Sequence, residues 1–211
     1  LMHAWNAQPY VLDRERVDLD LLATAARLLR TPGMPWVVAL LGLFQIIFNG
    51  FVNFLPTFLQ VEKGLTPATT SVVFASFFLV GAMANPVAGR LGDRLHHPLV
   101  AAMSSGVTAI GLTWILYTES LAGVVVGVLV IGAGGTAIWP VMTAFIMDLL
   151  PGESMGGDFG ALSTIYFLIG STGPTYVGVV AENADYATAY STLVVGLVAS
   201  VAIALVLARN Y

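Results

Sequence analysis

Three amide side chains, Gln45, Asn49 and Asn53, recur every four residues within a long apolar stretch. Residues four apart lie on one face of a helix, so the spacing places the three amides on a single stripe. Amides at membrane depth either border an aqueous cavity, where they can bind a polar solute, or join neighbouring helices by hydrogen bonds. We expect the stripe to border a cavity, and helix–helix bonding remains the alternative.

Three further side chains are candidates for the same cavity. Trp139 and Thr143 lie four residues apart around Pro140. This spacing predicts an aromatic platform and a hydroxyl on one side of a bent helix. Tyr166 is the third candidate, although a tyrosine packed at an interface fits the sequence equally well.

Charged groups avoid the middle of every apolar stretch. Asp148 comes nearest, and the three histidines, His3, His96 and His97, lie in polar regions. We therefore expect no catalytic residues, no metal site and no cofactor. A proton-driven transporter usually needs an ionisable group at membrane depth, so any such group would lie outside this chain. Amides and aromatic rings suit a neutral or weakly polar solute.

The composition is that of a membrane protein. Hydrophobic residues make up 57% of the 211 positions and charged residues 9%, with a mean hydropathy of +0.86, whereas soluble domains carry about a quarter charged residues. The apolar stretches are long enough to cross about 30 Å of hydrocarbon, and they must be helical to satisfy their own backbone. The net charge of −4 argues against a nucleic-acid partner, and the absence of cysteine excludes disulfides. We predict an all-α membrane protein with six transmembrane helices, over 35–60, 68–90, 98–118, 121–147, 159–181 and 187–208.

The polar residues define the domain organisation and the orientation. Residues 1–33 are predicted to form a cytoplasmic connector with a short surface helix, and 34–211 a six-helix transmembrane bundle. With six spans, one side of the membrane receives only Lys63. The other side receives seven arginines, which places both chain ends in the cytoplasm of a cell membrane: Arg14, Arg16, Arg27, Arg30, Arg90, Arg94 and Arg209.

Prolines recur at matching places when the six spans are divided into two triplets. The first span of each triplet contains one, Pro56 and Pro140, and the second spans contain Asn85-Pro86 and Gly173-Pro174. Because proline frees a backbone carbonyl and bends a helix, matching bends predict two inverted three-helix repeats. We expect Asn85 to cap the carbonyl that the adjacent proline frees.

The loop between the second and third spans reads GRLGDRLHH over 89–97. It resembles the G-x-L-a-D-r signature loop of the major facilitator superfamily. Residues 148–153, DLLPGE, are similar to the acidic, proline-containing end of that family's tenth helix. Residues 170–178 are similar to the glycine-proline stretch of its eleventh helix. The three motifs occur in the family's order and spacing.

The resemblance implies the carboxy-terminal six-helix half of a twelve-helix transporter. It also implies a charge network that latches one conformation, built from Gly89, Asp93, Arg94, Asp148 and Glu153. Relatives often place an arginine after the acidic-proline segment, where this chain has Ser-Met-Gly-Gly over 154–157, so the latch must use other pairings. In the alternative interpretation, the loop's basic residues only anchor the protein at the cytoplasmic side.

The function expected from these features is secondary active transport of a small solute by alternating access. The glycine-proline stretch favours export of the multidrug or small-molecule type, by its resemblance to family exporters. The expected partners are an amino-terminal six-helix half, the lipid bilayer and a small-molecule substrate. A self-contained six-helix channel or scaffold is the alternative, but a channel should show a re-entrant pore segment or a charged ring, and neither is visible.

Overall fold

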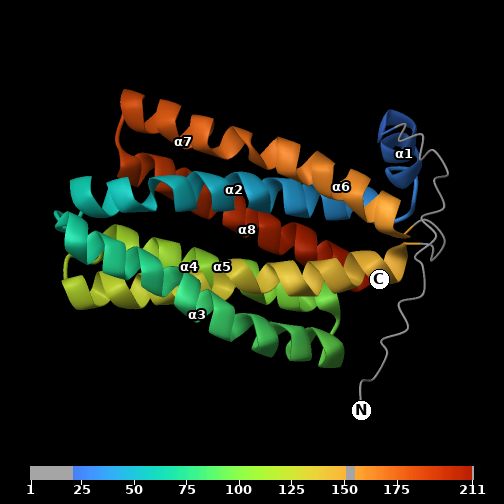
Figure 1. Cartoon of the computed structure of the whole chain (residues 1–211), viewed down its shortest axis with the longest axis horizontal. Coiled ribbons are helices and arrows are strands. Elements are labelled where there is room, and N and C mark those ends of the chain that lie inside the picture. Colours follow the sequence, from blue (N-terminus) through green and yellow to red (C-terminus); the bar gives the residue numbers. More distant parts are fainter. Residues whose placement is uncertain (1–20, 151–154, 211) are drawn as a thin grey trace, which may run out of the picture.

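The computed structural model describes residues 21–150 and 155–210, and nearly all of them are helical (Figure 1). Six spans are long and apolar enough to cross a membrane, and α6 and α7 together make the fifth. This confirms the predicted all-α membrane fold. The helices are α1 (Leu21–Leu28), α2 (Met34–Val61), α3 (Pro67–Arg94), α4 (His97–Tyr117), α5 (Leu121–Leu149), α6 (Met155–Gly170), α7 (Thr172–Asn183) and α8 (Tyr186–Asn210).

The short helix α1 lies at the place where the sequence predicts a surface helix in the connector. Residues 1–20 of that connector are outside the described residues. The division of the chain into a connector and a bundle therefore stays a prediction.

Short polar residues begin the helices where the pattern changes from loop to apolar span. The Thr66 hydroxyl accepts a hydrogen bond from the backbone N–H of Thr69 at 3.3 Å, and Ser120 accepts one from Gly123 at 3.1 Å. Such N-caps satisfy backbone donors that the first helical turn leaves free. Gly64 has a φ of +63°, which lets the chain turn between α2 and α3.

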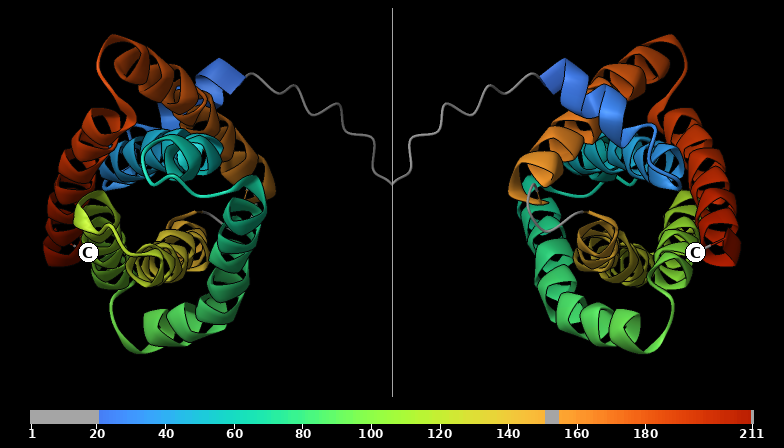
Figure 2. Two further views of the ribbon diagram at one scale, coloured as in Figure 1. Left: turned by 90° about the vertical axis from the view of Figure 1, so that its left-hand side faces the viewer. Right: turned by 90° about the vertical axis from the view of Figure 1, so that its right-hand side faces the viewer.

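The contacts between helices show the pattern expected of two inverted three-helix repeats. In the first triplet, α2, α3 and α4 correspond to α5, α6–α7 and α8 in the second. α2 packs on α6 and α7, just as α5 packs on α3, while α4 and α8 pack on each other. Seen end-on, α3 and α8 lie on opposite flanks of the bundle (Figure 2). These contacts support the predicted inverted repeat.

Two residues after α2 tie the helix ends together on the side opposite the chain's arginines. The Lys63 ammonium donates to the backbone oxygens of Leu116 and Thr118 at 3.1 and 3.0 Å, at the end of α4. A cation is favourable there because the C-terminal end of a helix carries partial negative charge. Glu62 accepts a hydrogen bond from the backbone N–H of Tyr186 at 3.2 Å, at the start of α8.

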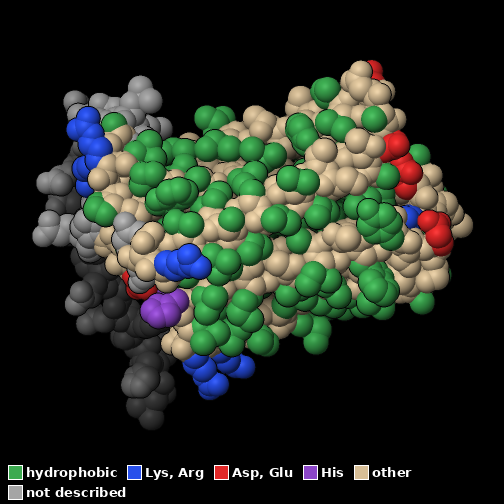
Figure 3. Space-filling model, turned by 180° about the vertical axis from the view of Figure 1, so that it is seen from behind, with side chains coloured by type: hydrophobic (Ala, Val, Ile, Leu, Met, Phe, Trp, Pro, Cys, Tyr) green, Lys and Arg blue, Asp and Glu red, His purple; other side chains and the backbone are tan. Residues whose placement is uncertain are grey.

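Charged side chains gather at the two ends of the bundle (Figure 3). In that view the histidine and most basic side chains lie at one end and most acidic side chains at the other, with hydrophobic side chains between them. The acidic end includes Asp185, where hydrogen bonds from the Thr188 side chain and backbone lower the pKa of the carboxyl group. The charge-free belt is what a hydrocarbon core requires.

Replacing Lys63 with methionine should destabilise the bundle. The substitution keeps the apolar stem but leaves two part-buried backbone oxygens at the C-terminal end of α4 without their donor. The loss should cost about 1 kcal/mol, the lower end of the range for buried acceptors. Thermal unfolding in detergent micelles measures the loss. The matched control is Glu119→Gln, because this carboxylate lies 3.9 Å from the Lys63 ammonium but is 89% exposed. Equal loss in both variants would contradict the capping role.

Candidate functional site

Two of the three amides on α2 contact the junction between α6 and α7. Gln45 is buried, and a Cβ added at Gly170 would overlap its side chain. The Asn49 amide donates to the backbone oxygen of Gly170 at 3.2 Å. In this structure Asn49 therefore joins helices by a hydrogen bond, the alternative that the sequence left open, whereas Gln45 packs against Gly170 and its buried Oε1 has no hydrogen-bond partner among the described residues. A role for them in lining a solute path remains a prediction.

Asn53 has a different environment. Its side chain is exposed, and its amide donates to the backbone oxygen of Asn49, one turn earlier in α2, at 2.8 Å. Its carbonyl oxygen takes part in none of the hydrogen bonds found among the described residues. Asn53 is thus the member of the stripe best placed to bind a solute.

Trp139 lies at the centre of an aromatic cluster that joins three helices. Its ring meets Phe44 and Phe48 of α2 edge-on, each at a centroid distance of 5.8 Å, and stacks on Tyr166 of α6 at 6.5 Å. The Tyr166 hydroxyl donates to Ser163 at 3.0 Å. Edge-on and offset contacts of this kind hold aromatic rings in defined orientations. The aromatic cluster is therefore assembled from α2, α5 and α6, and its role as a platform for a solute stays a prediction.

The accessible side chains among these candidates carry polar groups but no charge. Trp139 and Thr143 are half-buried, one helical turn apart on α5, while Tyr166 is buried behind the indole. Asn53 adds an exposed amide on α2, about 140° around that helix from Phe48, which meets Trp139, so Asn53 lies apart from the Trp139 cluster. Among the described residues, the charged groups lie near the helix ends. We call these three separate accessible positions, Asn53 on α2 and Trp139 and Thr143 on α5, the polar–aromatic surface.

A buried carboxylate near the predicted cytoplasmic end was missed by the sequence analysis. Asp158, in the first turn of α6, is 2% exposed and pairs with Arg27 of α1. The pair docks the connector helix on the bundle, and a carboxylate in a first turn also meets the positive end of the helix. The predicted fifth span began at residue 159, so Asp158 was assigned to a loop. The two residues are 131 positions apart, and no local pattern relates them.

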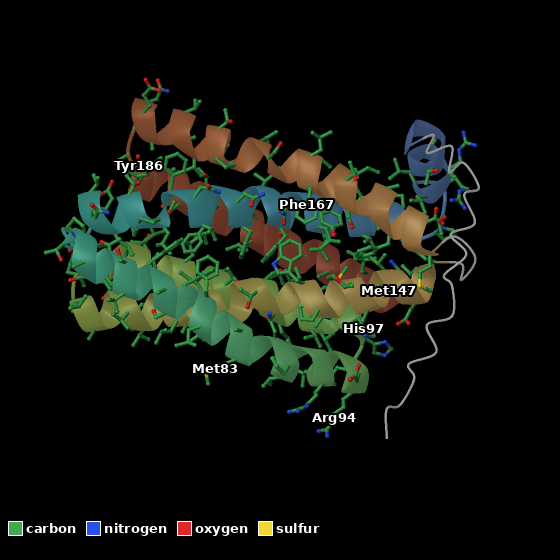
Figure 4. The ribbon with its side chains drawn as sticks, viewed as in Figure 1. Met83, Arg94, His97, Met147, Phe167 and Tyr186 are labelled. Atoms are coloured by element: carbon green, nitrogen blue, oxygen red, sulfur yellow. The ribbon has the colours of Figure 1, made fainter. Side chains whose placement is uncertain are left out.

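Three of the predicted latch residues lie around one groove. The α3–α4 loop and the end of α5 enclose about 460 Å³, lined in part by Asp93, Arg94 and Asp148. His97 is also in this lining, with its Nδ1 3.9 Å from an Asp148 carboxylate oxygen. Figure 4 shows Arg94 and His97 at this end of the bundle.

Gly89 and Glu153 are the other two predicted latch residues. Gly89 lies one turn before Asp93 and has open space where a Cβ would stand. Glu153 is outside the described residues. Gly92, by contrast, lets the loop fold back, because a Cβ there would approach the His97 ring to 3.2 Å. The structure thus brings Asp93, Arg94 and Asp148 together, and their role as a latch stays a prediction.

The predicted helix bends differ in how sharply they break the helix. Pro56, Pro86 and Pro140 lie inside continuous α2, α3 and α5, whereas the stretch around Gly173-Pro174 divides the fifth span at Ser171.

Asn85 does not cap its own helix's freed carbonyl as expected. Oriented to satisfy its surroundings, its amide nitrogen lies within hydrogen-bond distance of the Thr136 hydroxyl and backbone oxygen of α5, at 3.0 and 3.1 Å, and of Gly81 O at 3.2 Å, so its two hydrogens are shared among three acceptors. The small Gly81 explains the difference, because it brings α5 within reach of the Asn85 side chain.

An all-α bundle of six membrane-length apolar spans, with its charged side chains near the helix ends, has the construction of a polytopic membrane protein. The chain belongs to the Major Facilitator Superfamily, whose family pattern matches residues 37–211. This confirms the family that the loop motifs indicated. It also confirms the expectation of a transporter-family protein rather than an enzyme.

Curated relatives from Mycobacterium tuberculosis cover different shares of the chain. A probable nitrate/nitrite transporter, NarK2, is 29% identical over 94% of this chain and 48% of its own length. An uncharacterized MFS-type transporter is 30% identical over 60% of this chain and 23% of its own length. The chain thus spans about half or less of the curated relatives it matches.

The fold is also similar to that of a solved transporter. The crystal structure of the POT family transporter PepTSo superposes with a TM-score of 0.72 at 18% identity, covering 84% of this chain and 37% of that one. At this identity the likeness concerns the fold alone.

Removing the Arg27 guanidinium should loosen α1 from the bundle. The ion pair is half exposed on the arginine side, so its loss should cost about 1 kcal/mol, or about fivefold in the opening equilibrium. Because the chain lacks cysteine, a Leu28→Cys reporter at a buried position of α1 can follow opening by its rate of maleimide labelling.

The variants to compare are Arg27→Gln and Arg30→Gln, each with the reporter. Arg30 is exposed and forms none of the ion pairs found within 21–150 and 155–210. Labelling should accelerate only for Arg27→Gln. Acceleration by both substitutions would indicate a general charge effect and would contradict the docking role of the pair.

Proposed function

We propose that this chain is the carboxy-terminal half of a secondary active transporter that moves a small, neutral or weakly polar solute by alternating access. The observation that carries the proposal is the polar–aromatic surface, with an exposed amide on α2 and a half-buried indole on α5, both away from the charged helix ends. Family membership supports transport, and the surface supports the class of solute.

The partner in this proposal is an amino-terminal six-helix half. The curated relatives are about twice the length of the chain or more, so a second bundle of similar size accords with them. The α3 span also leaves large apolar side chains exposed, including Val72, Leu79 and Met83. Lipid and the second half together would cover this helix.

We assign the arginine-bearing end of the bundle to the cytoplasm of a plasma membrane. Arg90 and Arg94 end α3, Arg209 ends α8, and Arg27 lies on the docked helix α1. Lys63 is at the other end and is occupied in capping α4. This asymmetry is the positive-inside pattern of membrane proteins.

Export is the direction we favour, and nitrate is the competing candidate solute. The preference for export rests on the glycine-proline stretch around Pro174, which is similar to that of family exporters. Nitrate enters through the name of the relative NarK2. An anion at membrane depth needs a positive partner, and the described residues place their cations near the helix ends. A nitrate site would therefore depend on charge from the other half.

Transport should require both halves and should depend on Asn53. We expect proteoliposomes containing this chain and its amino-terminal half to move neutral solutes, tested with a labelled panel alongside labelled nitrate. Asn53→Ala should raise the KM of the transported solute roughly tenfold, the effect of losing about 1.4 kcal/mol of binding, with little change in maximal rate.

The matched control is Asn183→Ala. Asn183 is also exposed and also donates to the backbone oxygen one turn earlier, Val179 O at 2.8 Å, but it lies at the end of α7. Its KM should be unchanged. Robust flux from this chain alone, insensitive to Asn53→Ala, would favour a channel and overturn the proposal. Nitrate as the sole transported solute would reject the neutral-solute assignment.

A further inference from the structure

Two prolines of the bundle each free a backbone oxygen, and an asparagine of another helix reaches that same oxygen. In an α-helix the N–H of residue i bonds to the oxygen of residue i−4, and proline has no N–H. Pro174 therefore frees Gly170 O, to which Asn49 of α2 donates at 3.2 Å. Pro140 frees Thr136 O, to which the Asn85 amide of α3 donates at 3.1 Å in the orientation that satisfies its surroundings.

The helices also approach closely at both places. On the α2–α7 crossing, a Cβ at Gly173 would overlap the backbone oxygen of Ile46, and a Cβ at Gly50 would lie 2.8 Å from Val177. On the α3–α5 crossing, a Cβ at Gly81 would lie 2.7 Å from Thr136. Small residues at a crossing let two backbones come within reach of a short side chain such as asparagine.

The two crossings occupy equivalent places in the repeat, but their parts are exchanged. In the α2–α7 pair, the first helix of one triplet supplies the asparagine and the second helix of the other triplet supplies the proline. In the α3–α5 pair, the second helix supplies the asparagine and the first helix supplies the proline. In each pair, a hydrogen bond from an asparagine side chain takes the place of the backbone hydrogen bond that the proline removes. This hydrogen bond connects the two triplets.

We propose that Asn49 and Asn85 are positioning residues. Each replaces the hydrogen bond that a proline of the neighbouring helix removes, and thereby sets the bend and the relative position of two helices that must shift during transport. The amide can release the oxygen and bond it again without unwinding either helix, unlike a backbone N–H. The role in transport rests on the proposed function, whereas the bonding to the prolines' freed oxygens does not.

A double-mutant cycle tests each amide against its proline. Asn49→Ala should raise the unfolding equilibrium constant of this chain in detergent roughly threefold or more, the typical effect of a hydrogen bond between membrane helices. Pro174→Ala restores the N–H at position 174, so Gly170 O regains a partner. In the Pro174→Ala background, Asn49→Ala should therefore cost much less. The equivalent cycle pairs Asn85→Ala with Pro140→Ala.

Pro86 provides a sharp control because it is adjacent to Asn85. If Asn85 capped its own helix's freed oxygen, Pro86→Ala would relieve the effect of Asn85→Ala and Pro140→Ala would not. We expect the opposite. The crossed pair, Asn49→Ala with Pro140→Ala, should be additive, because the two residues belong to different crossings. Additivity in both matched cycles overturns the proposal.

Transport kinetics and distances separate a positioning role from a solute contact. In the complete two-half transporter, Asn49→Ala should lower the maximal rate severalfold, leave KM unchanged and be partly rescued by Pro174→Ala. Spin labels on the Met155 end of α6 and the Asn183 end of α7 should show a broader distance distribution in Asn49→Ala. A raised KM without rescue would make Asn49 a solute contact and overturn its positioning role.

If the reconstituted transporter moves no solute, the proposed function fails, while the stability cycles and label distances still decide whether the amides act on the prolines' oxygens. If a proline variant does not fold, Asn49→Leu and Asn85→Leu keep comparable side-chain volume without a donor. They should broaden the same distance distributions as the alanine variants. Unchanged distributions in the leucine variants count against the proposal.

Discussion

In lipid no water completes a broken backbone hydrogen bond, so every freed group must find a partner within the protein. The rest of this structure depends on that constraint. Serine and threonine hydroxyls bond back to carbonyls within their own helices, as Thr108 does to Ser104 O at 2.8 Å. Lys63 covers the end of α4 with two donors. For the same reason, an asparagine that donates to a backbone oxygen left free by a proline stabilises the bundle.

Close packing of the helices helps to meet this need for hydrogen-bond partners. A short side chain can reach the backbone of another helix only when that helix lies close by. Gly134 illustrates this on α4 and α5, where Ser104 donates to its oxygen and a Cβ would meet the backbone nitrogen of Thr108 at 2.8 Å. The α2–α7 and α3–α5 crossings add prolines to such contacts. Tight glycine contacts therefore resist separation of the helices, while the prolines leave their bend angles adjustable.

Hydropathy and periodicity predicted the six spans because each span is a local property of the sequence. Periodicity also put Gln45, Asn49 and Asn53 on one face, but it cannot state which helix that face meets. Contact with α6–α7 depends on Gly170, more than a hundred residues away. Asn85 was assigned to the wrong oxygen for the same reason, and the Arg27–Asp158 pair has no local signal at all. The loop motifs indicated that Asp93, Arg94 and Asp148 lie near one another, because resemblance to a family carries information about long-range contacts. The structure places all three around one groove.

A hydrogen bond within α2 links Asn53 of the polar–aromatic surface to Asn49 of the α2–α7 crossing. Asn53, the exposed amide, donates to the backbone oxygen of Asn49, and Asn49 donates in turn to Gly170 O. One helical turn of α2 thus joins the amide best placed to meet a solute to the amide that covers the freed oxygen of α6–α7. Coupling between distant sites needs a demonstrated connecting element. Here the candidate connecting element is two consecutive hydrogen bonds. Under the proposed function, a solute that competes for the Asn53 amide would act on Asn49, which covers the backbone oxygen at the α6–α7 bend.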